Sequence, residues 1–128
     1  MYLGIDMKIF LIDIDGTVCE NVRNEEGIEA MRNAKPFKES IEQINQWYNE
    51  DNYICFFTAR TDEHRKVTEE WLKQNNVKFN QVIFNKPRKI GGFKEYHFID
   101  DSPARATTFK GKFTKLVKKK VEIEVFED

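Results

Sequence analysis

The sequence predicts an α/β protein built around a mostly parallel β-sheet. Four short apolar runs, of the kind that form buried strands, each stop at a polar residue: residues 9–12, 53–57, 81–84 and 96–99. The segments between the first three runs have the apolar spacing of helices, and this alternation is typical of parallel βαβ units. The 128 residues suffice for one hydrophobic core, so we expect a single domain over residues 1–128.

The first run is apolar on both faces until two carboxylates appear. Residues i and i+2 of a strand point to the same side, so Asp13 and Asp15 would face one ligand at the strand's end. Phe10 and Ile12 make the opposite face apolar as well, which predicts a central parallel strand. Gly16 follows the acids and permits a sharp turn.

The connections have different signals. Residues 18–35 are polar and weakly periodic, and they predict a flap loop that overhangs the strand ends. Apolar residues at helical spacing behind a proline predict a helix over 37–48. A second helix is expected to begin at Thr61 or Asp62 and to end near Asn75.

The C-terminal third is predicted to complete the sheet. A glycine pair precedes the run at 96–99, and Ser102 with Pro103 predicts the start of a helix through Phe109. Residues 113–117 and 121–126 alternate like closing strands. Six lysines between positions 110 and 120 suggest either a nucleic-acid strip or a solvated edge hairpin with paired charges, and the hairpin is favoured.

Each predicted strand ends in a residue suited to phosphate or metal binding. Thr58 follows the second run, Lys86 the third, and the acid pair Asp100 and Asp101 the fourth. In open parallel sheets, ligands bind outside the carboxyl ends of the strands, where these side chains would gather. The sequence therefore predicts one site assembled from strand ends.

Composition argues against other partners. The net charge of −1, with 34% charged residues, gives no overall reason to expect binding to nucleic acid or a membrane. No apolar stretch approaches about 20 residues and no signal peptide is visible, so we expect a cytoplasmic protein. Cys19 and Cys55 are too few for a disulfide framework, and we expect neither to react or to bind zinc.

The order of these residues resembles the haloacid dehalogenase superfamily of phosphatases and phosphotransferases. The matching positions are Asp13-Ile-Asp15-Gly16-Thr17, Thr58 in Phe-Phe-Thr-Ala-Arg, Lys86, and Asp100-Asp101. The resemblance covers roughly residues 8–116 and implies a three-layer α/β/α Rossmann-like sandwich with the first strand central. There is no room for a separate cap domain, so the chain looks most like small sugar-phosphate phosphatases of the capsule-biosynthesis type.

The resemblance also implies a mechanism. Asp13 would attack phosphorus to form an aspartyl-phosphate, and Asp15 would give and take the proton. The residues expected at the phosphate are Gly16, Thr17, Thr58, Ala59, Arg60 and Lys86. Carboxylates about 4 Å apart repel by roughly 4 kcal/mol at an effective dielectric near 20, so a dication is required. Oxygen ligands favour Mg²⁺, which would be held by Asp13, the main chain of Asp15, Asp100 and Asp101.

Some assignments stay open at this stage. Arg60 and His64 would contact a second anionic group of the substrate, contact another subunit, or lie in solvent. Without a cap domain the site should be open, so either the substrate is large or a homo-oligomer covers the site around a small phosphorylated substrate. The alternatives are a nucleic-acid 3′-phosphatase of the same superfamily and a receiver-like signalling domain, although receivers have their acid pair first.

Overall fold

The structure is a computed structural model that describes residues 7–88, 91–93, 95–104, 106, 108–109 and 111. The chain divides into two compact units, Met1–Pro87 and Arg88–Asp128. The first unit contains every helix and strand of the described residues. None of the described helices has both the length and the apolar character needed to cross a membrane.

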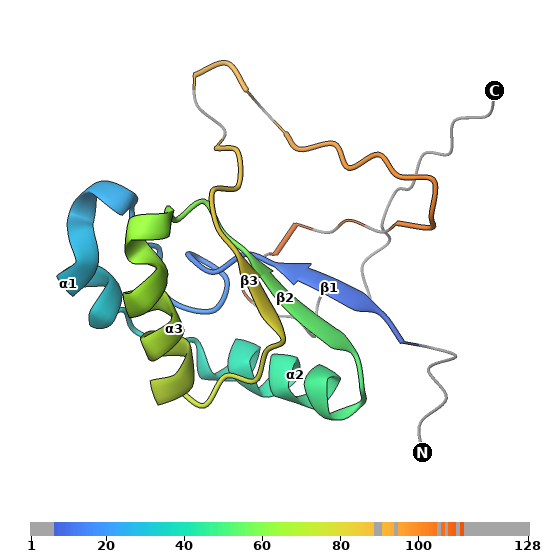
Figure 1. The fold of residues 1–128 in the computed structure, drawn as a ribbon, viewed down its shortest axis with the longest axis horizontal. Helices are drawn as coiled ribbons and strands as arrows, with labels where there is room; N and C mark the ends of the chain where they lie inside the picture. Colours follow the sequence, from blue (N-terminus) through green and yellow to red (C-terminus); the bar gives the residue numbers. More distant parts are fainter. Residues whose placement is uncertain are drawn as a thin grey trace. The chain divides into compact units, whose positions relative to one another are not determined.

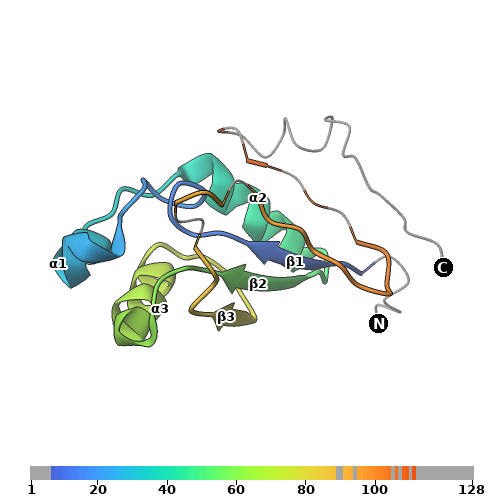
Figure 2. The same ribbon diagram turned by 90° about the horizontal axis from the view of Figure 1, so that it is seen from above.

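The first unit is built on a parallel sheet of three strands. They are β1 (Ile9–Ile12), β2 (Tyr53–Phe57) and β3 (Gln81–Ile83), in the order β1-β2-β3 (Figures 1 and 2). Both neighbouring pairs are parallel. The predicted α/β Rossmann-like class is therefore confirmed, and the carboxyl ends of all three strands lie at one edge of the sheet.

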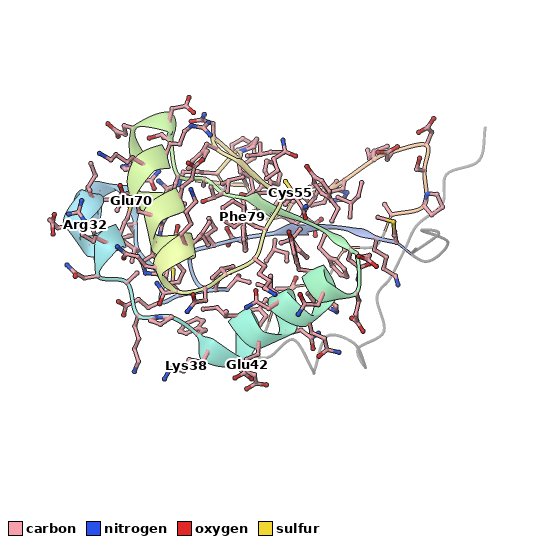
Figure 3. The ribbon with its side chains drawn as sticks, turned by 60° about the horizontal axis from the view of Figure 1, so that its bottom comes forward. Arg32, Lys38, Glu42, Cys55, Glu70 and Phe79 are labelled. Carbon is pink, nitrogen blue, oxygen red and sulfur yellow. The ribbon has the colours of Figure 1, made fainter. Side chains whose placement is uncertain are left out.

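Two helices connect these strands much as the sequence predicts. α2 spans Lys38–Asn49, and α3 spans Arg65–Gln74 behind a 3-10 turn at Asp62–His64 that Thr61 begins. The Phe10 ring of β1 stacks on Trp47 of α2, with ring centroids 4.2 Å apart. Figure 3 shows Lys38 and Glu42 on the outer side of α2, away from the sheet, as expected for an amphipathic helix.

One expectation for the first unit was wrong. The predicted flap loop at 18–35 contains a 3-10 turn at Asn24–Glu26 and the helix α1 (Gly27–Arg32). α1 lies beside α3 (Figure 1) and buries Met31, so tertiary packing stabilises a helix too short to show periodicity. Among the described strands, β2 lies between β1 and β3. The prediction that β1 is central in the whole sheet stays a prediction, because the predicted closing strands lie outside the described residues.

The second unit has less regular structure than predicted. Residues 96–99 form no strand, and the described residues of 102–109 form no helix. A four-residue run with three apolar residues and His97 is a weak signal, and a strand needs a hydrogen-bonded neighbour to form. The predicted closing strands at 113–117 and 121–126 and the six lysines of 110–120 lie outside the described residues.

Candidate active site

Asp13 and Lys86 meet at the carboxyl ends of β1 and β3. The ammonium Nζ of Lys86 lies 3.2 Å from Oδ1 of Asp13. The main chain places this lysine, because Lys86 N–H donates to the carbonyl of Thr58 over 2.8 Å. Asn85, with φ of 66°, turns the chain just before it. The Asp13 side chain is 41% exposed, so its carboxylate has a cation beside it and remains open to a ligand.

Asp15 lies in a different environment and is held by Arg60. The Nε and Nη2 atoms of Arg60 donate to Oδ2 and Oδ1 of Asp15 over 3.0 and 2.7 Å. The Arg60 side chain is 1% exposed and that of Asp15 is 15% exposed. The sequence suggested that Arg60 would contact the substrate, contact another subunit or lie in solvent. In the structure its guanidinium instead forms an ion pair with Asp15.

The turn after Asp15 uses the main-chain groups of Gly16 and Thr17 internally. Gly16 has φ of 82°, the left-handed conformation that glycine adopts readily. The Gly16 N–H donates to the carbonyl of Cys19, and the Thr17 N–H donates to the carbonyl of Ile14. Thr17 is buried. Both residues stand at the predicted edge, and their expected contact with phosphate stays a prediction.

Thr58 and Ala59 are tied into the protein. Oγ1 of the fully buried Thr58 accepts the Arg60 N–H over 3.1 Å. The Ala59 carbonyl accepts a hydrogen bond from Nδ2 of Asn24 over 3.0 Å. Asn24, which the sequence did not single out, therefore links the segment of residues 18–35 to the end of β2.

Two further buried polar residues are His64, at the end of the 3-10 turn, and Thr68 on α3. Nδ1 of His64 accepts the Thr61 N–H over 3.2 Å and caps the 3-10 turn, and the residue is 3% exposed, so His64 does not lie in solvent. Thr68 was missed from the sequence; its Oγ1 accepts a bond from Nη1 of Arg60 over 2.9 Å. The available signal was a hydroxyl on the apolar face formed by Val67 and Trp71.

Asp100 and Asp101 belong to the second unit. Oδ1 of Asp100 accepts the Ser102 N–H over 3.0 Å, and this bond is the main reason that the pKa of Asp100 is lowered. Within the part of the chain that the structure describes, no three His, Cys, Asp or Glu side chains gather as metal ligands. The convergence of Asp100 and Asp101 with Asp13 stays a prediction.

Cys19 lies behind the acid pair and is buried. Its Sγ is 3.8 Å from Oδ1 of Asp15, and its pKa is raised to about 12 by burial first and by the Asp15 carboxylate second. Because the thiolate is the reactive form, we expect Cys19 to resist iodoacetamide in the folded protein at pH 8. Mass spectrometry should find it labelled only after unfolding, and rapid labelling of folded protein would contradict the buried position.

Comparison with known families covers nearly the whole chain. Residues 10–125 match the model of the family described as PITM 1-3, LNS2 domain. The fold and this match define a phosphatase-type domain of the haloacid dehalogenase superfamily. Within that superfamily the chain belongs to the LNS2 domain family. The superfamily prediction is confirmed, whereas the narrower resemblance to minimal-cap sugar-phosphate phosphatases is not supported by the match.

Two solved structures share the fold. A crystal structure of a structural-genomics target from Vibrio cholerae has 23% identity and a TM-score of 0.55, over 74% of this chain and 80% of that one. A structure of a Pnkp1/Rnl/Hen1 complex has 14% identity and a TM-score of 0.54, over 66% of this chain and 29% of that one. A search of curated proteins found no match.

Proposed function

We propose that the chain is a magnesium-dependent phosphomonoester hydrolase that works through an aspartyl-phosphate on Asp13. The observation that carries this proposal is the pair of Asp13 and Lys86. The carboxylate is 41% exposed at the carboxyl edge of the sheet, and an ammonium lies 3.2 Å away. A nucleophile that attacks a phosphate dianion needs both access and nearby positive charge.

The two aspartates have different roles in the reaction. An oxygen of Asp13 attacks phosphorus while the bond from phosphorus to the ester oxygen breaks, and Asp15 protonates the leaving oxygen. Water then attacks the aspartyl-phosphate, Asp15 takes its proton, and Asp13 is regenerated. Their surroundings differ, because the Asp13 side chain is 41% exposed and open to a ligand, whereas that of Asp15 is 15% exposed and its direction is fixed by Arg60.

Phosphate charge would be balanced by Lys86 and by a bound cation. The Lys86 ammonium lies 3.2 Å from Oδ1 of Asp13 and would contact phosphoryl oxygens as well. The proposed donor set would consist of carboxylate and carbonyl oxygens, which are the ligands that Mg²⁺ prefers. Asp13, the Asp15 carbonyl, Asp100 and Asp101 would hold the ion, and its charge would reduce repulsion between the carboxylates and the substrate.

The substrate class is proposed more broadly than the reaction. A small phosphorylated metabolite such as a sugar phosphate suits a nucleophile that is open to solvent, and a second copy of the chain would supply a cover for the site. A 3′-phosphorylated nucleic acid is the alternative, and it would require a basic surface. No described residue favours that alternative.

Phosphate release from a panel of substrates tests the proposal. The panel holds 4-nitrophenyl phosphate, several sugar phosphates and a 3′-phosphorylated oligonucleotide, each with Mg²⁺ and with a chelator. We expect release from at least the aryl ester and one metabolite, and a fall of about 100-fold or more on chelation. Preferred, salt-sensitive release from the oligonucleotide would select the alternative substrate. No release from any member would contradict the hydrolase.

A further inference from the structure

Arg60 is one of the most enclosed charged residues that the structure describes. Its side chain is 1% exposed, and all three guanidinium nitrogens bond to protein oxygens. Two of them donate to Asp15 and the third, Nη1, donates to Oγ1 of Thr68. Nη2 is also 4.0 Å from Sγ of Cys19. The main chain of Arg60 is fixed as well, because its N–H donates to Oγ1 of Thr58 and its carbonyl accepts the Asn85 N–H.

This placement suits an internal support better than a substrate contact. An arginine that binds a substrate phosphate must present N–H groups where the phosphate enters, and the nitrogens of Arg60 are directed elsewhere. A bidentate guanidinium does fix the plane and direction of the carboxylate that it holds. Thr68 is itself 1% exposed on α3, and it accepts from Nη1, the guanidinium nitrogen that does not bond to Asp15.

We propose that Arg60 is a positioning residue that orients the Asp15 carboxyl for proton transfer, and that Thr68 keeps Arg60 in place. This inference rests on the proposed hydrolase function, in which Asp15 moves the proton. A general acid must lie within hydrogen-bond reach of the leaving oxygen, so a small rotation of Asp15 would slow the step that needs the proton. Substrates whose leaving oxygen is stable as an anion, such as 4-nitrophenyl phosphate, need that proton less.

The test compares leaving groups in Arg60→Gln and Thr68→Val. We expect kcat for a sugar phosphate to fall about 100-fold in Arg60→Gln, near the lower limit of a general-acid contribution, and kcat for 4-nitrophenyl phosphate to fall by about tenfold. KM should change by less than about twofold for both. Thr68→Val keeps the shape of the side chain. Its kcat should also fall more for the sugar phosphate than for 4-nitrophenyl phosphate, but both losses should be smaller than in Arg60→Gln. Arg65→Gln, on the exposed side of α3, is the matched control and should behave as the wild type.

Different results would overturn the proposal. A raised KM with unchanged kcat would make Arg60 a substrate contact, and equal losses on both substrates would leave only a structural role. Unchanged kinetics in Thr68→Val would overturn the role of Thr68, and that variant remains informative if Arg60→Gln does not fold. The Arg60→Gln results are read only from protein with a native far-UV spectrum.

Failure of the hydrolase function would be recognised separately, because the wild type would then release no phosphate. In that case a double-mutant cycle in urea unfolding decides whether Arg60 holds Asp15. Arg60→Gln should lower the unfolding midpoint much less in the Asp15→Asn background than in the wild type. Additive effects would show that the pair does not act as a unit, and would overturn the positioning role whatever the chemistry.

Discussion

Replacing Asp13 by asparagine is expected to abolish phosphate release, with a loss of about 10⁴-fold or more, because the covalent route has no other nucleophile. The fold should survive. The side chains of Asp13 and Lys86 are 41% and 14% exposed, and we expect this partly exposed ion pair to contribute only about 1 kcal/mol to stability. The measurements are turnover of 4-nitrophenyl phosphate with Mg²⁺ and the free energy of unfolding in urea.

Asp51→Asn is the matched control for this variant. Asp51 is exposed in the turn after α2 with φ of 69°, a conformation that asparagine tolerates. The same chemical change there should leave both turnover and stability near the wild-type values. Activity retained in Asp13→Asn would rule out the aspartyl-phosphate at Asp13.

Asp15→Asn is expected to lose activity and stability together. The asparagine removes the negative charge that balances Arg60, whose guanidinium is 1% exposed. Removing one partner of a buried pair typically costs about 3–5 kcal/mol, because the other charge is left unbalanced. We expect the lower end of that range, because the amide oxygen still accepts one of the two hydrogen bonds.

Unfolding of the two variants side by side checks this difference. Asp13→Asn should unfold near the wild-type urea concentration, and Asp15→Asn should unfold at a clearly lower one. Equal midpoints would mean that the bond between Asp15 and Arg60 contributes little to the folded state. Turnover by Asp15→Asn should fall more for alkyl phosphates than for 4-nitrophenyl phosphate, since Asp15 supplies the proton.

Much of the first unit was predictable because its signals are local. Each of the three strands is an apolar run closed by a polar residue, and α2 and α3 repeat apolar residues at helical spacing. The prediction of a loop over 18–35 was wrong because α1 is only six residues long and is stabilised by tertiary packing rather than by a visible apolar repeat. The strand expected at 96–99 is not formed, since so short a run, with three apolar residues, does not determine which strand it pairs with.

The candidate site was likewise predictable in its residue types but not in its contacts. The sequence by itself determined which chemistry is available: acids, a hydroxyl and an ammonium at strand ends, in the order typical of one superfamily. Only the tertiary structure decided which charges meet, with Lys86 at Asp13 and Arg60 at Asp15. Residue type and spacing determine local geometry, but the partner of a buried charge depends on which group the packing brings near it. The buried guanidinium of Arg60 is balanced by Asp15, which is 45 residues away in the sequence.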